Sequence, residues 1–188
     1  MQRFRLTPPE SAGEETQQLY RDFMRQTGSV RVPIYIQSLG HDPRLLRAYW
    51  ERTKGCLLGG TLPMLLKELV VFTVSRVNGA AYCSACHAHA VLRLDETLSY
   101  ADLDRMVYEG DTAFLPPAHA AAIRFAQDLA TNANQVEDQA FQALLDAGFS
   151  DAEVHELLGV VDLAMMFNTY TSAVQLPIDP EYQAEIAA

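Results

Sequence analysis

Two of the three cysteines and two of the five histidines in this chain lie in nine residues, "YCSACHAHA", at positions 82–90. On a helix, Cys83, Cys86 and His87 stand at i, i+3 and i+4 and share one face. His89 lies at the edge of that face. Thiols and imidazoles in this arrangement could serve nucleophilic, redox or metal chemistry. The plainer alternative is that cysteine and alanine fill a tight helix contact while the histidines are hydrogen-bonded.

Haem and zinc are both disfavoured by the surrounding sequence. "CSACH" fits the C-x-x-C-H haem-attachment pattern, but covalent attachment normally needs export, and the start "MQRFRLTPPESAGEE" has no apolar export segment. Four ligands within seven helical residues cannot surround one tetrahedral zinc ion. The other candidate ligands are scattered along the chain: Cys56, His41, His119 and His155. We therefore expect no metal and no other cofactor.

Thiol chemistry fits the segment best. Cys83 is expected in the first turn of its helix, where free backbone N–H groups and the helix dipole favour a thiolate. His87, one turn later, can exchange a proton with that sulfur. We therefore expect Cys83 to be more acidic and more reactive than Cys56 and Cys86. Oxidation should give a sulfenic acid on Cys83 or a strained disulfide with Cys86, acting as a resolving thiol.

The elements that position these residues are predicted to be helices throughout. Start and stop signals delimit about seven or eight helices in one all-α domain over residues 1–188, and no alternating strand pattern occurs. The most apolar helix runs from Pro63 to Asn78-Gly79 and should lie at the centre of the domain or in a subunit interface. Helix-start patterns are Ser11 with Glu14, Asp42 with Pro43, Ser99 with Asp102, and Ser150 with Glu153; Gly28 closes the first helix, and Gly148 with Phe149 forms a Schellman stop.

Composition limits the partners. The chain has 14 basic and 24 acidic residues, a net charge of −10, which repels nucleic acid and anionic lipid. We find no apolar run of about 18 residues and so expect no membrane span. Three cysteines without an export signal favour a reducing compartment, so we expect a cytoplasmic protein.

The stretch "KELVVFTVSRVNGAAYCSACHAHA" resembles the motif of the alkylhydroperoxidase D (AhpD)-like and carboxymuconolactone decarboxylase superfamily. Further segments resemble its peroxidase-related branch, so that the likeness covers most of the chain: "LGHDPRLLRAYWE", "AAIRFAQDLAT", "LLDAGFSDAEVHELLGVVDLAMMFNTY" and "LPID". The resemblance implies an AhpD-like helical fold and a thiol-dependent peroxidase.

The motif can be aligned in two registers. If Cys83 and Cys86 are the family's cysteine pair, its histidine position falls on Ala90. If Asn78-Gly79 sets the register, Ala80 replaces the first cysteine, Cys83 is the second, and His87 is the motif histidine. We prefer the second register because Glu68 then has the family spacing.

The preferred register implies a role for each matched residue. Cys83 is the peroxide-reacting thiol, and His87 and Glu68 relay protons. The resolving cysteine is absent at Ala80, so either Cys86 or an external thiol must take its place.

Glu68 could also be an ordinary carboxylate near a helix start, beside Lys67. In a straight antiparallel helix pair it would lie nearer residues 90–94 than His87. We therefore expect a water molecule or a neighbouring subunit to bridge Glu68 and His87.

Three functions follow as alternatives. The first is reduction of a hydroperoxide or another small molecule, with electrons from an unidentified thiol. The second is a decarboxylase-like reaction on a small carboxylated substrate, for which a cationic pocket is expected; the basic residues near the motif are Lys67, Arg76 and Arg93. The third is a non-catalytic helical oligomer that lost activity with Ala80.

We also expect a homo-oligomer, and the family resemblance implies a dimer, trimer or hexamer. "LVVFTV" and "LLGVVDLAMMF" are apolar around most of their helices, so the interface should use the helix from Pro63 to Gly79 or the long C-terminal helix.

Overall fold

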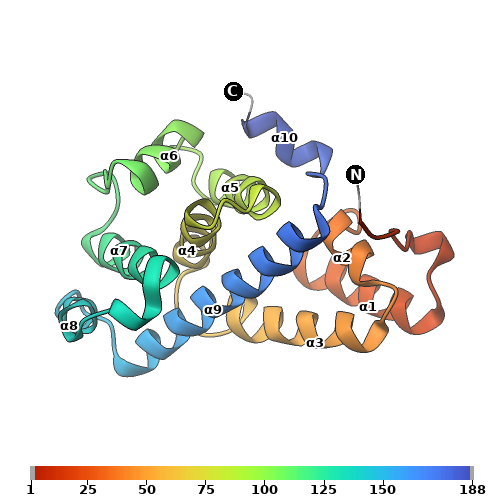
Figure 1. The fold of residues 1–188 in the computed structure, drawn as a ribbon, viewed down its shortest axis with the longest axis horizontal. Coiled ribbons are helices and arrows are strands. Elements are labelled where there is room, and N and C mark those ends of the chain that lie inside the picture. The colour runs from red at the N-terminus through yellow and green to blue at the C-terminus, as the bar shows by residue number, and fades with distance from the viewer. Residues whose placement is uncertain (1–2, 187–188) are drawn as a thin grey trace.

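The computed structural model describes residues 3–186, and within them the chain forms helices and no strand (Figure 1). This confirms the expected all-α fold. The ten α-helices of this range are α1 (Glu14–Thr27), α2 (Ile34–Leu39), α3 (Pro43–Thr53), α4 (Met64–Val77), α5 (Ala81–Leu94), α6 (Tyr100–Tyr108), α7 (Pro117–Asn132), α8 (Asp138–Asp146), α9 (Asp151–Val174) and α10 (Pro180–Ile186). The two beyond the expected eight, α2 and α10, have only six and seven residues, too few for an apolar periodicity to be read.

Helix α4 is the centre of the molecule, as its all-round apolar sequence predicts. Every residue from Leu66 to Ser75 is buried, and the surrounding helices are α5, α7 and α9. The helix ends at Asn78, and Gly79 adopts a φ of 64°, a left-handed conformation that glycine adopts without strain. This reversal lets α5 pack back on α4.

The first three helices build a second, smaller core around Tyr20, Leu46 and Trp50. In Figure 1 this group lies to one side, and the long helix α9 runs from the α7–α8 end of the molecule toward it. Tyr35, Leu58 and Tyr170 contact both apolar clusters. The junction between the two cores is therefore the place where side chains from the two ends of the sequence meet.

Most of the predicted helix ends are formed as expected. The Asp42 carboxylate accepts hydrogen bonds from the backbone N–H groups of Arg44 and Leu45, and Ser99 and Ser150 form capping boxes. At the end of α8 the N–H of Phe149 donates to the Leu144 carbonyl, the bond of a Schellman stop.

The capping box expected at Ser11 is wrong. The Ser11 hydroxyl donates instead to the carbonyl of Pro8, within a short 3₁₀ turn at Pro9–Ser11, and α1 begins after Gly13. The proline pair before Ser11 closes this turn before α1 can start.

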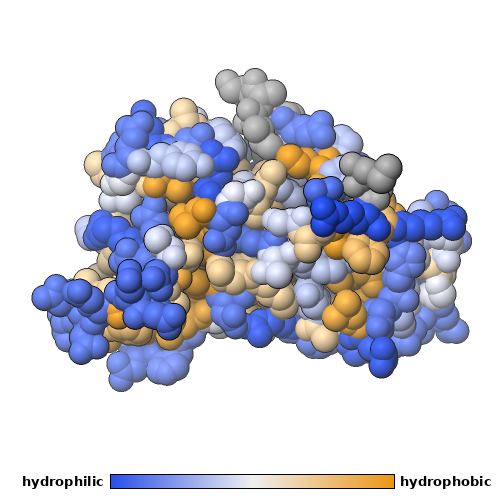
Figure 2. Space-filling model, viewed as in Figure 1, coloured by the Kyte–Doolittle hydropathy of each residue, from blue (hydrophilic) through white to orange (hydrophobic). Residues whose placement is uncertain are grey.

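Among the helices of residues 3–186, α9 alone is long and apolar enough to cross a membrane by length and composition. This measure averages hydropathy along the helix, whereas the expectation of no membrane span rests on an uninterrupted apolar run, which α9 lacks because Asp162 and Asn168 interrupt it. That expectation stays a prediction. Half of the most apolar part of α9 is buried inside the molecule, and the helix packs on α4, α5 and α7. These contacts are those of a core helix, and hydrophilic residues cover most of the molecular face in Figure 2.

Candidate active site

A cavity of about 920 Å³ lies at the junction of the two apolar cores. Its wall comes from α1, the α1–α2 connection, α2, the end of α3 with the turn that follows it, and from α4, α5, α9 and α10. Cys83, Cys86, His87 and Glu68 all line it. The structure therefore brings the four residues singled out in the sequence to the wall of one cavity.

Glu68 and His87 contact each other directly. The Oε2 atom of Glu68 lies 2.6 Å from Nδ1 of His87, and the two residues are only 7% and 8% exposed. The expected bridge through water or a second subunit is thus not needed. Glu68 lies eleven residues before Gly79 and His87 eight residues after it, an offset of about 4.5 Å of helix rise, which the two side chains span.

This contact sets the chemistry of the imidazole. An ionised Glu68 can only accept a hydrogen bond, so Nδ1 of His87 donates and Nε2 is left as the basic nitrogen. The His87 ring stacks on Phe167 of α9, with 6.0 Å between centroids and planes 16° apart. Carboxylate and phenyl ring together fix the orientation of the base.

Cys83 lies in the first turn of α5, as expected, but its environment differs from the prediction. The residue is 2% exposed, and its Sγ atom lies 3.2 Å from the Thr171 hydroxyl on α9. Burial raises the pKa of the Cys83 thiol to about 12, while the Thr171 hydrogen bond acts in the opposite direction. The expected depressed pKa is therefore wrong, because burial of the sulfur penalises the charged thiolate.

Cys86 is half-buried on the same wall, and all three cysteines are free thiols. Burial, followed by the nearby Glu68 charge, raises the pKa of the Cys86 thiol above its usual range, while a hydrogen bond with Tyr182 lowers it. Tyr182 belongs to α10 and also packs on His89, with 5.2 Å between ring centroids. The C-terminal helix thus closes the cavity beside Cys86.

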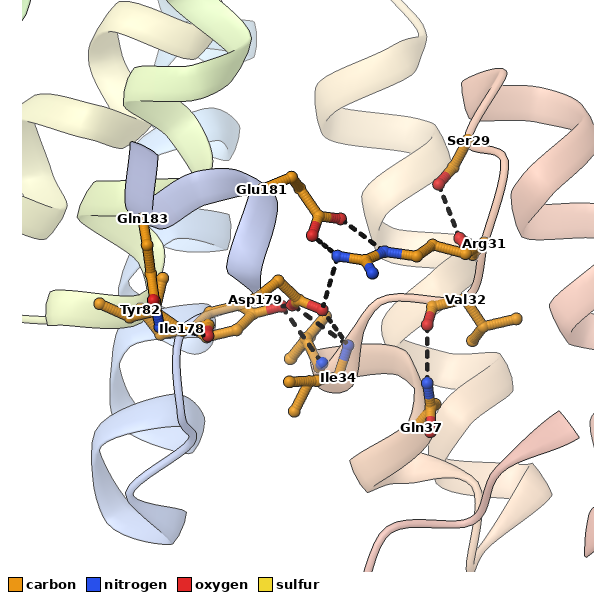
Figure 3. Close-up of polar contacts among 11 residues, drawn as sticks. Ser29, Arg31, Val32, Ile34, Gln37, Tyr82, Ile178, Asp179, Glu181 and Gln183 are labelled. Atoms are coloured by element: carbon orange, nitrogen blue, oxygen red, sulfur yellow. Dashed lines mark hydrogen bonds and ion pairs between the residues drawn. The ribbon is translucent and has the colours of Figure 1, made fainter. Parts of the chain in front are cut away.

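A buried polar network holds this closing helix in place (Figure 3). The Asp179 carboxylate is 3% exposed; it accepts a hydrogen bond of 2.7 Å from the Tyr82 hydroxyl and further bonds from the Ile34 N–H. Arg31 pairs with Asp179 at 3.9 Å and with Glu181. Asp179 therefore joins α2, α5 and α10 at the residue next to Cys83.

Of the three basic residues near the motif, Arg93 lines the cavity, and Lys67 and Arg76 do not. Lys67 pairs with Glu156 and Arg76 with Asp104, both outside the cavity. Arg93 and, unexpectedly, Arg31 line the cavity. Within residues 3–186, no three His, Cys, Asp or Glu side chains gather in a way that could hold a metal ion.

Ala80 is buried at the N-cap of α5 and does not line the cavity. No local pattern in the sequence indicates the other residues around the cysteines, because they come from remote segments: Thr171, Phe167, Tyr182, Asp179 and Arg31. Asp179 lies in the segment "LPID", which resembles the family but has no role assigned by that resemblance.

Comparison with known proteins identifies the fold. Residues 43–128 match the model of the carboxymuconolactone decarboxylase family, and no curated protein matches the chain. The structure of an alkylhydroperoxidase AhpD core, a peroxidase-related protein from Ralstonia eutropha JMP134, has a TM-score of 0.82 at 22% identity and covers 96% of this chain and 93% of its own. A peroxidase-related protein from Silicibacter sp. TM1040 has a TM-score of 0.81 at 23% identity, covering 94% and 91%.

A third similar structure has a different activity. The debrominase Bmp8 in complex with 2,3,4-tribromopyrrole has a TM-score of 0.78 at 20% identity, covering 93% of this chain and 90% of its own. At these identities the likenesses show the fold, which is the AhpD-like fold expected from the motif.

Proposed function

Since the chain carries a carboxymuconolactone decarboxylase family region at residues 43–128 on an AhpD-like fold, we propose that it is a thiol-dependent oxidoreductase that reduces an organic hydroperoxide. The observation that carries this proposal is the buried Glu68–His87 pair on the same cavity wall as Cys83. Nucleophile, base and orienting carboxylate form the arrangement that activates a weak nucleophile.

The reaction begins from a protonated thiol. His87 takes the Cys83 proton at Nε2, and the sulfur attacks the outer oxygen of the hydroperoxide. The O–O bond breaks as the S–O bond forms, and His87 returns the proton to the departing alkoxide. Thiol and hydroperoxide thus become sulfenic acid and alcohol: sulfur is oxidised and the peroxide is reduced.

The cycle closes with a second thiol. Cys86 or a small external thiol attacks the Cys83 sulfenic acid, forms a disulfide and releases water. A mixed disulfide with an external thiol is reduced by one further external thiol, and a Cys83–Cys86 disulfide by two; in both cases the external thiols leave as their own disulfide. An external reductant fits a reducing compartment such as the cytoplasm. The cavity favours an organic substrate over hydrogen peroxide, because much of its wall is apolar: Phe23, Ile36, Leu57, Leu58, Met64 and Phe167.

A second candidate is acid–base chemistry on a small carboxylated compound without thiol oxidation. Two observations favour it: the raised pKa of Cys83 and the presence of Arg93 and Arg31 on the cavity wall. In that case Glu68 and His87 would act on the substrate, and Cys83 would be dispensable.

The test is a single turnover with cumene hydroperoxide, followed by dimedone trapping and mass spectrometry of each cysteine. We expect a sulfenic acid on Cys83, loss of hydroperoxide consumption in Cys83→Ser, and unchanged consumption in the control Cys56→Ser. Cys86→Ser should accumulate the sulfenic acid if Cys86 resolves it. A Cys83 that stays a free thiol while Cys56 oxidises would rule out the peroxidase.

A further inference from the structure

Thr171 places a hydroxyl group on the reacting sulfur from the far end of the sequence. It lies on α9, is 2% exposed, and its Oγ1 atom is 3.2 Å from Sγ of Cys83. Cys83 and Thr171 are 88 positions apart in the sequence. The contact is made because α5 and α9 pack against each other.

The orientation of this hydroxyl differs from that of other helical threonines in the molecule. Four of them donate at 2.8 Å to the carbonyl four residues earlier, which is the usual local bond of a helical threonine: Thr27, Thr53, Thr73 and Thr131. Thr171 turns toward Cys83 instead. Its proton is therefore available to the sulfur.

We propose that Thr171 is a catalytic residue whose hydroxyl stabilises the Cys83 thiolate and selects this cysteine as the nucleophile. The inference rests on the proposed thiol chemistry. In the resting state the Cys83 thiol can donate to Oγ1 of Thr171. When the proton leaves for His87, the hydroxyl rotates and donates to the negatively charged sulfur.

A hydrogen bond from Thr171 offsets part of the cost of forming a thiolate in a buried site. Burial opposes formation of a thiolate on Cys83, and the bond from Thr171 works against that penalty. A hydroxyl that can both accept and donate serves the thiol and the thiolate without a movement of either helix. Thr171 therefore supplies stabilisation that the helix N-terminus alone does not provide.

The test measures the alkylation rate of each cysteine by iodoacetamide between pH 7 and 10, with mass spectrometry, in the full-length protein. For Thr171→Val we expect Cys83 to react about tenfold more slowly at a given pH, the size expected for losing one hydrogen bond to a charged group. Thr171→Ser should keep the wild-type rate within about threefold. Cys56, in the same samples, is the internal control and should not change.

A second variant separates hydrogen bonding from access. Thr171→Ala also lacks the hydroxyl but opens space beside the sulfur, so it too should react more slowly if the hydroxyl matters. A Cys83 rate that is unchanged or higher in either folded variant would overturn the proposal. Because no hydroperoxide is used, this result is independent of the peroxidase assay: an inactive wild-type protein with the expected Thr171 effect would refute the proposed function alone.

Discussion

Glu68 and His87 come from different helices and are both more than nine-tenths buried. A buried carboxylate and a buried imidazole are each costly unless they are paired and hydrogen-bonded. Their 2.6 Å contact provides this pairing, and its place on a cavity wall marks it as a candidate for proton transfer.

Glu68→Gln should reduce turnover while leaving the fold intact. The amide keeps the size of the side chain but carries no negative charge. The Nδ1–H group of His87 then no longer donates to a carboxylate, so Nε2 becomes a weaker base. We expect kcat/KM for the hydroperoxide to drop about 10²-fold, within the range of acid–base effects. Steady-state kinetics with circular dichroism as the folding check would measure it.

The matched control for this variant is Glu156→Gln. Glu156 pairs with the buried Lys67, and its carboxylate accepts hydrogen bonds from the backbone N–H groups of Thr61 and Leu62. These contacts lie away from the cavity. This change should lower stability and leave kcat/KM nearly unchanged. If the two variants lose activity equally, Glu68 has no special part in catalysis.

The chemistry on one helix could be predicted from the sequence, and the contacts between helices could not. Cys83, Cys86 and His87 follow from helical spacing, and the structure places all three on one wall. A straight antiparallel helix pair places Glu68 beside residues 90–94, so it does not predict the direct contact of Glu68 with His87. Thr171 could not be found, since no local pattern relates α5 to α9. The raised pKa of Cys83 likewise depends on burial that only the packed chain creates.

At the scale of elements, the short helix α10 is held at the site by polar contacts as well as by the packing of Tyr182 on His89. Asp179, just before it, receives hydrogen bonds from Tyr82 on α5 and from the first residue of α2. These bonds tie both ends of the chain to the cysteine helix (Figure 3). The sequence did not reveal α2 or α10, because helices of six or seven residues show no apolar period and depend on such tertiary bonds.

Asp179→Ala should detach α10 from the cavity. The Tyr82 hydroxyl loses its acceptor and the Ile34 N–H loses its partner, and each loss costs about 1–3 kcal/mol. We expect the free energy of unfolding in urea to fall by about 2–4 kcal/mol, and Cys86 to be alkylated faster because Tyr182 no longer covers it.

Glu181→Gln is the control for Asp179→Ala. It breaks only the outer contact of Arg31, whose side chain is 48% exposed, so the stability loss should stay below about 1 kcal/mol. Equal Cys86 alkylation rates in Asp179→Ala and Glu181→Gln would show that the buried carboxylate does not hold α10 over the cavity.

At the scale of the whole molecule, the other helices bury most of α4 but leave part of α9 exposed. Ten consecutive residues of α4 are buried by neighbouring helices of the same chain, and the exposed apolar residue of this helix is Val77 at its end. The rest of the most apolar part of α9 is partly buried or exposed, and its exposed large apolar side chain is Met165. Of the two helices expected to form a subunit interface, we therefore predict that α9 forms it, around Met165.

We predict a homo-oligomer that associates through the outer side of α9. Met165 and Val77 are 36% and 37% exposed, and they lie close together because the Asn78 amide contacts the Met165 sulfur at 3.0 Å. Light scattering at micromolar concentration should give a mass well above the 20.9 kDa of one chain, and Met165→Glu should reduce it by placing a charge in the contact. Leu145→Glu, at a similarly exposed position on α8, should leave the mass unchanged. A mass that stays near 20.9 kDa as concentration rises would mean that α9 faces solvent and that the site is complete within one chain.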